Sequence, residues 1–320
     1  MQNNIPKIVV LDGNAVNPGD ISWEPISSIG DFTLYPRSTQ EQAIERAKHA
    51  DIIINNKVKL DEQVLSRLPN LKYIGLLSTG YDVVDIEYAR KRGIVVCNVP
   101  AYSSKSVAQL TIALLLELAM NVGAHSTSVQ QGDWSRCPDF CYWLNDIIEL
   151  DGKTIGLVGY GSIGRYVAQI AKSLGMNVLA YSRSGKVDSN AKHASLDQLL
   201  SVSDVVSLHC PLNDQSKRII DATALSKMKQ GSFLINTARG GLVVEQDVAN
   251  ALDSGHLRGY GADVLASEPP TKHNLLATHP KAIVTPHIAW ASVSARQRLL
   301  GVASQNIKSF LTGKIVNQVN

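Results

Sequence analysis

Arg239, Glu268 and His287 are the residues of this chain whose types and positions point most directly to chemistry. Each follows a short apolar segment with the composition of a strand, and each is of a type that binds anionic groups or moves protons. Ligands of open parallel sheets bind at the carboxyl ends of the strands, so we expect the three side chains on one side of a sheet. Taken singly, a surface arginine, a loop glutamate and a structural histidine explain them as well. Their shared placement favours a catalytic interpretation.

A glycine-rich loop precedes these residues in the chain. It forms a G-x-G-x-x-G pattern after the apolar segment 155–158 and before an amphipathic helix expected over 163–174. In a dinucleotide-binding loop of this kind, the first glycine permits a tight turn, the second lets the backbone approach a pyrophosphate, and the third lets the helix pack closely. A glycine turn that binds nothing is the alternative. The cofactor-binding residues predicted from the loop are Gly159, Tyr160, Gly161, Ser162, Ile163 and Gly164.

The residues after the next strand bear on the type of cofactor. An enzyme that uses NAD usually carries an acidic residue there, which accepts hydrogen bonds from the ribose. This chain has Ser182, Arg183 and Ser184 instead, with no acid before Asp188. Arg183 could pair with the 2′-phosphate of NADP, and the serines could donate hydrogen bonds to it. A solvated surface arginine is the alternative, but the pattern favours NADP over NAD.

Two alternations of strands and helices predict the scaffold for these residues. In the first hundred residues, strands are expected at 8–11, 32–35, 51–54, 71–76 and 95–97, with helices at 41–49 and 61–68. From Lys153 onwards, strands at 155–158, 178–181, 205–208, 232–236, 259–263 and 282–284 alternate with further helices. Near-continuous apolar strands in such an alternation indicate parallel sheets covered on both faces. The predicted fold class is α/β, with two doubly wound parallel-sheet (Rossmann-like) domains and a cleft between them.

Two long helices, expected at 104–122 and 293–311, indicate how the domains are connected. The second is a lone terminal helix that needs an existing surface to dock on, and the first domain offers one. We therefore predict a substrate-binding (catalytic) domain of residues 1–99 plus 288–320, and a dinucleotide-binding domain of residues 100–287.

Composition and charge exclude several other classes of protein. Of the 320 residues, 44% are hydrophobic and 18% charged, which is typical of a globular protein. The formal net charge of +3 is spread along the chain, so we expect no nucleic-acid partner and no membrane partner. A secretory signal is not recognisable at the N-terminus, and a cytoplasmic protein is expected. The four cysteines make no zinc-ribbon pairing, so reduced thiols are expected and no metal is predicted; a metal bound by Cys137, Cys141 and a nearby histidine is the alternative.

Short segments throughout the chain resemble the D-isomer-specific 2-hydroxyacid dehydrogenases. The resemblance covers nearly the whole chain, and the order Arg, Glu, His is highly specific. Around Trp290 the sequence is similar to the glycerate dehydrogenase and hydroxypyruvate reductase branch, whose members reduce hydroxypyruvate and often glyoxylate. The resembling segments are 78–82, 98–103, 209–212, 236–240, 263–269 and 285–290.

The resemblance implies a role for each candidate residue. Arg239 would bind the substrate carboxylate and polarise the 2-oxo group, while His287 would exchange a proton with the substrate oxygen. Glu268 would orient the imidazole and favour its charged form. In the first domain, backbone N–H groups of Thr79 and Gly80 would complete the carboxylate site. Further cofactor contacts are implied for His209, Cys210, Pro211, Thr237, Ala238 and Asp263.

The predicted function is hydride transfer between NAD(P)H and a small 2-oxo acid to give a D-2-hydroxy acid, with hydroxypyruvate or glyoxylate giving D-glycerate or glycolate. One alternative is a non-catalytic relative that senses dinucleotides, as the family's transcriptional corepressors do; another is an unrelated Rossmann enzyme. Glu268 argues against formate dehydrogenase, in which Gln stands beside the histidine. Gln109, where relatives often carry Glu, is expected to alter an interdomain contact. Lys57 either faces the cleft or is solvated.

The resemblance also suggests a homodimer built from the cofactor domains. Segment 134–151 is rich in Trp, Phe, Tyr and Cys and lies outside the alternation of strands and helices. Such an apolar stretch needs a surface to cover it, and an arm exchanged between subunits would provide one. Packing into the core of its own subunit is the alternative.

Overall fold

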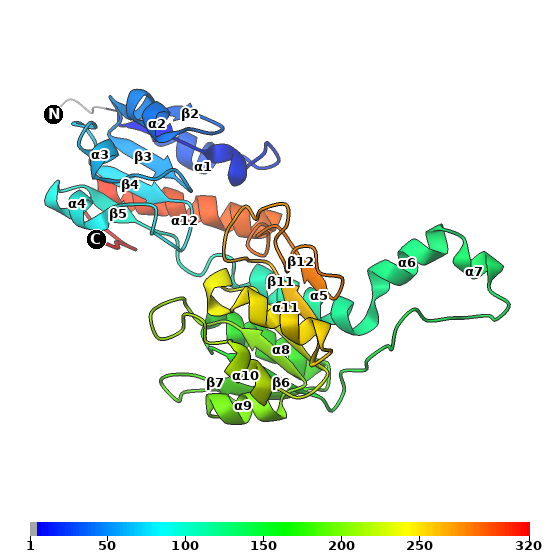
Figure 1. Ribbon diagram of the computed structural model, residues 1–320. Helices are drawn as coiled ribbons and strands as arrows, with labels where there is room; N and C mark the ends of the chain where they lie inside the picture. The colour runs from blue at the N-terminus through cyan, green and yellow to red at the C-terminus, as the bar shows by residue number, and fades with distance from the viewer. Residues whose placement is uncertain (1–4) are drawn as a thin grey trace. The chain divides into compact units, whose positions relative to one another are not determined.

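Two compact units make up the part of the chain that the computed structural model describes, residues 5–320 (Figure 1). One unit contains the chain up to Ser103 together with Ala291–Asn320, and the other contains Ser104–Trp290. The sequence pattern predicts the boundaries after residues 99 and 287, and in the structure each lies a few residues further along the chain. Parallel sheets of five and seven strands form the two units, which confirms the predicted α/β fold class.

The smaller unit is built on the five-stranded sheet. Its elements are β1 (Lys7–Val10), η1 (Gly13–Ala15), α1 (Glu24–Ser27), β2 (Asp31–Leu34), α2 (Gln40–Ala47), β3 (Ile52–Asn55), α3 (Glu62–Leu65), β4 (Tyr73–Leu76), α4 (Ile86–Lys91), β5 (Val95–Cys97) and α12 (Val293–Leu311). The strand order is β2-β1-β3-β4-β5. Every residue of β3 and β4 is buried, as expected for strands covered on both faces. Helix α12 lies against β4 and α1, so the terminal helix docks on this unit.

The larger unit is built on the seven-stranded sheet. Its elements are α5 (Ser104–Met120), α6 (Val122–Gln130), α7 (Asp133–Arg136), β6 (Thr154–Val158), α8 (Ser162–Ser173), β7 (Asn177–Tyr181), β8 (Lys192–His193), α9 (Leu196–Val202), β9 (Val205–Leu208), α10 (Ala222–Lys227), β10 (Ser232–Asn236), η2 (Gly240–Leu242), α11 (Glu245–Asp253), β11 (Leu257–Ala262) and β12 (Ala282–Val284). The strand order is β12-β11-β10-β9-β6-β7-β8. It reverses direction between β6 and β9, and doubly wound sheets bind ligands at this point, beyond the carboxyl ends of the strands.

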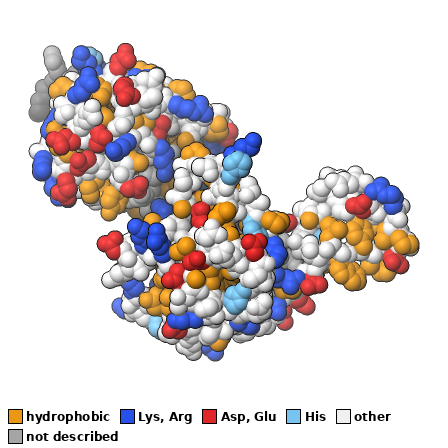
Figure 2. All heavy atoms as spheres, in the orientation of Figure 1, with side chains coloured by type: hydrophobic (Ala, Val, Ile, Leu, Met, Phe, Trp, Pro, Cys, Tyr) orange, Lys and Arg blue, Asp and Glu red, His pale blue; other side chains and the backbone are white. Residues whose placement is uncertain are grey.

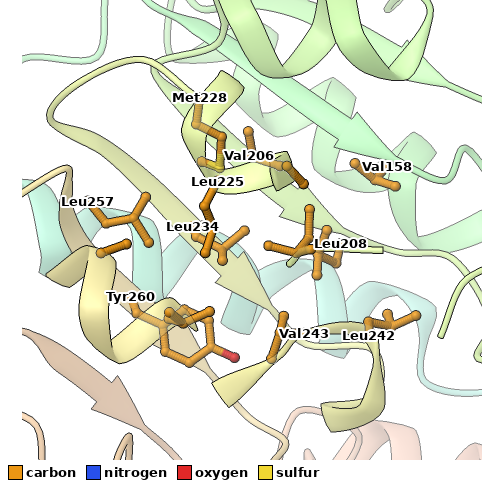
Figure 3. Packing of buried hydrophobic residues seen from close by; sticks show 14 of the residues in the cluster. Val158, Val206, Leu208, Leu225, Met228, Leu234, Leu242, Val243, Leu257 and Tyr260 are labelled. Atoms are coloured by element: carbon orange, nitrogen blue, oxygen red, sulfur yellow. The ribbon is translucent and has the colours of Figure 1, made fainter. Parts of the chain in front are cut away.

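Apolar packing fixes the strands of the larger sheet. Figure 3 shows Val206 of β9 and Leu234 of β10 beside Leu225 and Met228 at the end of α10. All four side chains are buried. Burying a side chain of this size stabilises the fold by roughly 1.5–3 kcal/mol. This packing holds in place the strands whose ends carry the candidate residues.

Helix α5 ends earlier than its apolar pattern predicts. The pattern extends to Val122, but Asn121 has a φ of 51°, and α6 continues at 59° to α5. Asparagine adopts this left-handed conformation more readily than most residues. Within residues 5–320, no single helix is long and apolar enough to cross a membrane. Helices α5 and α6 together reach the required length and apolar composition, but they are bent relative to each other. Helix α5 lies against α8, β10 and β11.

Helices α6 and α7 and the chain that returns from them form an arm of the larger unit, residues 122–147 (Figure 1). Hydrophobic side chains gather on the arm in Figure 2. Trp134, Phe140, Trp143 and Ile147 are 53%, 88%, 66% and 50% exposed. These side chains lie in solvent, so the interpretation that they pack into the core of their own subunit is wrong.

Candidate active site

The glycine-rich loop lies at the end of β6, where the order of the larger sheet reverses. Gly159 has a φ of 107°, and a Cβ there would lie 2.6 Å from the backbone nitrogen of Cys210, so only glycine fits. At Gly161 a Cβ would meet nothing within 4 Å, which leaves the start of α8 open. Residues 162–164 form the first helical turn, whose N–H groups have no partner within the helix. The loop therefore fits the pyrophosphate of a dinucleotide.

The loop after β7 presents Arg183 to solvent. Its guanidinium donates a long hydrogen bond of 3.5 Å to the side-chain oxygen of Gln215, and the hydroxyls of Ser182 and Ser184 lie 3.0 Å apart. Asp188, the first acid of the loop, accepts a hydrogen bond of 2.6 Å from the Tyr160 hydroxyl. This bond holds the pKa of Asp188 below its usual value. The acid thus ties the loop back to the glycine motif, while the arginine stays accessible.

His209 follows β9 and lies against Gly159. Its Nε2 is 2.9 Å from the Ser207 hydroxyl, and its Nδ1 is buried without a hydrogen-bond partner among the described residues. Burial lowers the pKa of His209 to about 4, so the ring is neutral at neutral pH. Burial also raises the pKa of the neighbouring Cys210 thiol. Because a buried polar atom is nearly always hydrogen-bonded in a native protein, the free Nδ1 is suited to a ligand at this edge.

The three candidate catalytic residues follow β10, β11 and β12, which are adjacent in the larger sheet. The Nδ1 of His287 lies 2.5 Å from the Oε2 of Glu268. The other carboxylate oxygen of Glu268 accepts a hydrogen bond of 3.0 Å from the backbone N–H of Leu265. Since the glutamate occupies Nδ1, Nε2 is the imidazole nitrogen left for a substrate. Both side chains are about one-third exposed, at 34% and 35%, and a small molecule can reach them.

Arg239 stands in the turn after β10, and its guanidinium is exposed. Buried Asn236 shapes this turn: its side chain donates to the Arg239 carbonyl at 2.9 Å and accepts from the Ala238 N–H at 3.1 Å. A Cβ on Gly240 would lie 2.0 Å from the backbone of Leu265, so the turn abuts the loop that follows β11. The sequence pattern does not single out Asn236 as functional, although a polar residue that ends an apolar strand is a usable signal.

The other residues of the predicted cofactor wall lie at the same edge of the sheet. The Thr237 hydroxyl is 2.8 Å from that of Thr111 on α5, and the Pro211 carbonyl accepts a hydrogen bond from Ser216 at 2.6 Å. Asp263 is 1% exposed, and its carboxylate accepts hydrogen bonds from residues 285, 288 and 289. In the structure this carboxylate therefore holds the loop that carries His287.

Thr79 and Gly80 lie in the smaller unit, in the loop after β4. Side chains hold both carbonyls: Asn98 donates to the Thr79 carbonyl at 2.7 Å, and Ser78 donates to the Gly80 carbonyl at 2.6 Å. The two backbone N–H groups make no hydrogen bond within residues 5–320. Two neighbouring N–H groups without an internal partner can bind an anion.

Lys57 and Gln109, whose roles the sequence leaves open, are both exposed. Lys57 follows β3 and lines a cavity of about 280 Å³ in the smaller unit, together with Asp12 and Arg37. Its backbone N–H donates to the buried Asp12 carboxylate at 2.6 Å. Gln109 lies on α5.

Comparison with known proteins identifies the family. Residues 112–289 match the family model described as D-isomer specific 2-hydroxyacid dehydrogenase, NAD binding domain. The chain belongs to this family. A hydroxypyruvate reductase of Blautia hydrogenotrophica is 43% identical and aligns over 98% of this chain and 99% of its own. A glycerate dehydrogenase of Methylorubrum extorquens is 41% identical, over 98% of each chain.

Among solved structures, an acyclic imino acid reductase in complex with NADPH and D-Arg superposes with a TM-score of 0.86 at 31% identity, over 98% of this chain and 100% of that one. This D-2-hydroxyacid dehydrogenase uses a nicotinamide dinucleotide to reduce 2-oxo acids, as the family and its named relatives indicate. The predicted enzyme class is confirmed, and the alternative of an unrelated Rossmann enzyme is wrong. The relatives lend no support to the non-catalytic alternative.

Proposed function

We propose that this dehydrogenase reduces hydroxypyruvate and glyoxylate to D-glycerate and glycolate, and that it prefers NADPH. The contact between His287 and Glu268 carries the proposal, because it leaves one imidazole nitrogen exposed for a substrate oxygen. The names of the two relatives, hydroxypyruvate reductase and glycerate dehydrogenase, support the choice of substrate.

The proposed mechanism divides the work between cofactor and protein. A dinucleotide bound at the glycine-rich loop supplies the hydride. His287, as imidazolium, gives the Nε2 proton to the substrate oxygen, and it takes the proton back in the reverse direction. Glu268 contacts Nδ1 through its carboxylate and so orients the imidazole ring. Arg239 pairs with the substrate carboxylate and polarises the carbonyl to be reduced.

The two units then have separate tasks. The larger unit, with Gly159, Gly161 and His209 at the reversal of its sheet, binds the dinucleotide. In the smaller unit, the free N–H groups of Thr79 and Gly80 form a separate binding element for a carboxylate. This assignment follows the domains predicted from the sequence.

A substrate panel tests the proposed function. Hydroxypyruvate, glyoxylate, pyruvate and a bulkier 2-oxo acid are each assayed with NADPH and with NADH, and kcat/KM is compared. We expect the highest values for hydroxypyruvate and glyoxylate, with NADPH ahead of NADH. Failure of every 2-oxo acid with both cofactors would overturn the proposal. A clear advantage for NADH would overturn the cofactor preference alone.

Replacing Arg183 by Ala is expected to raise the KM for NADPH and leave the KM for NADH almost unchanged. The exposed guanidinium is proposed to pair with the 2′-phosphate, which NADH lacks. A hydrogen bond to a charged group contributes about 1.5–3 kcal/mol, so the increase should be roughly 10- to 100-fold. Steady-state kinetics with both cofactors measure it, and NADH serves as the internal control. Equal changes for the two cofactors would contradict the pairing.

We also propose that the arm, residues 122–147, covers a second copy of the chain in a homodimer. Exposed aromatic side chains on one segment are unfavourable in water and typical of protein interfaces. The double substitution of Phe140 and Trp143 by Asp should therefore produce monomers, as measured by sedimentation velocity. Val202→Asp is the control, because Val202 is an exposed apolar residue outside the arm. A wild-type chain that sediments as a monomer would contradict the proposal.

A further inference from the structure

His287 has an unusual backbone conformation for a residue with a side chain. Its φ is 55°, in the left-handed region that glycine occupies without penalty. A non-glycine residue held in a sparsely populated region is strained and persists only when its surroundings fix it. The local hydrogen bonds must therefore compensate for this conformation.

Two side chains hold the peptide group that follows His287. The indole Nε1 of Trp290 donates to the His287 carbonyl at 2.8 Å, and the next N–H, that of Ile288, donates to Asp263 at 2.8 Å. Both polar ends of one peptide group are thus occupied. The N–H of His287 itself donates to the carbonyl of Thr285 at 2.9 Å. Every backbone polar group of the histidine and of the peptide after it has a partner.

Asp263 alone cannot provide this restraint. Its carboxylate also accepts a hydrogen bond of 2.7 Å from the N–H of Ala289, so Asp263 binds backbone N–H groups of the loop and leaves the carbonyl of His287 free. The Trp290 indole is the partner of the His287 carbonyl, three residues before it in the chain. If that bond is lost, the peptide plane can rotate, and the imidazole then loses its alignment with Glu268.

We propose that Trp290 is a positioning residue for the reaction, whose indole N–H fixes the backbone of His287 and so aims Nε2 at the substrate oxygen. This inference rests on the proposed function for the role of His287. It gives a physical reason for a tryptophan at this position that is independent of contact with any particular 2-oxo acid.

The first test is kinetic and uses Trp290→Phe, which keeps an aromatic ring and removes the N–H. We expect kcat for hydroxypyruvate to fall about 10- to 100-fold, the scale of a misplaced catalytic group, while the KM for hydroxypyruvate and the Kd for NADPH change little. Trp23→Phe is the control, since that half-buried ring lies in the smaller unit.

The second test does not depend on turnover. In proton NMR of the full chain, the Nδ1 proton shared with Glu268 should give a strongly downfield signal, assigned by its absence in His287→Gln. Trp290→Phe should weaken or shift this signal, and Trp23→Phe should not. If Trp290→Phe is poorly folded, benzothienylalanine at position 290 replaces only the indole N–H by sulfur and retains the bicyclic ring.

The outcomes separate the two proposals. Wild-type kcat and a wild-type NMR signal in the variant would overturn the positioning role, as would a loss of NADPH affinity as large as the loss of kcat. A wild-type protein that reduces no 2-oxo acid would overturn the proposed function. In that case the NMR comparison would still decide whether the indole N–H aligns His287 with Glu268.

Discussion

Replacing His287 by Gln is expected to lower kcat for hydroxypyruvate reduction by about 100- to 10,000-fold, the range that general acid catalysis contributes. Glutamine can form hydrogen bonds but cannot deliver a proton to the substrate oxygen. The dinucleotide loop lies at β6, away from β12, so the Kd for NADPH should stay close to that of the wild type. Stopped-flow reduction and equilibrium titration with NADPH measure the two effects separately.

His279→Gln is the matched control for this variant. His279 also has a carboxylate partner, with Nε2 3.2 Å from Asp253, and it lies in the same unit. The His279→Gln enzyme should reduce hydroxypyruvate at the wild-type rate. A His287→Gln enzyme whose kcat stays within a few-fold of the control would contradict the proposed acid.

Replacing Arg239 by Ala is expected to lower kcat/KM for hydroxypyruvate by roughly 100- to 1,000-fold. Two charge-assisted hydrogen bonds from a guanidinium to a carboxylate contribute about 3–4 kcal/mol together, which corresponds to this factor. Arg239 is exposed, and its turn adjoins the loop that follows β11, so we expect the guanidinium to bind the carboxylate of a substrate that contacts His287. Steady-state kinetics with saturating NADPH measure the loss.

Arg239→Lys separates charge from geometry, because lysine keeps the charge and loses the planar fork. Its kcat/KM should lie between those of the alanine variant and the wild type. Arg90→Ala, on the surface of α4 in the smaller unit, is the control and should have no effect. If Arg239→Ala altered only the affinity for the dinucleotide, the carboxylate role would be wrong.

The sequence predicts the larger sheet almost residue by residue. Strands β9 and β10 coincide with the segments 205–208 and 232–236, because strands buried on both faces must be largely apolar. The edge strand β12, which is only partly buried, also coincides with the predicted segment 282–284. The short elements α1, α4 and β8 are absent from the prediction. They contain four, six and two residues, too few for a periodic pattern, and they depend on packing against the rest of their unit.

For the candidate site, the sequence predicts which residues lie at the ends of strands. It does not predict the hydrogen bonds that fix their side chains and backbone. The contact between Glu268 and His287 depends on the path of two loops, which no local pattern encodes. Asn236 and Trp290 act through side-chain bonds to backbone groups, and such bonds form only when the turns are folded. The carboxylate of Asp263, which the sequence predicts to contact the cofactor, also accepts three hydrogen bonds from the loop that carries His287, and these bonds could not be read from the sequence.

The stereochemistry of the product tests the central claim most directly. Hydroxypyruvate is reduced with NADPH, and the glycerate formed is resolved by chiral chromatography and compared with the amount of NADPH oxidised. The proposed function predicts one D-glycerate for each NADPH consumed. No glycerate, or L-glycerate as the main product, would contradict it.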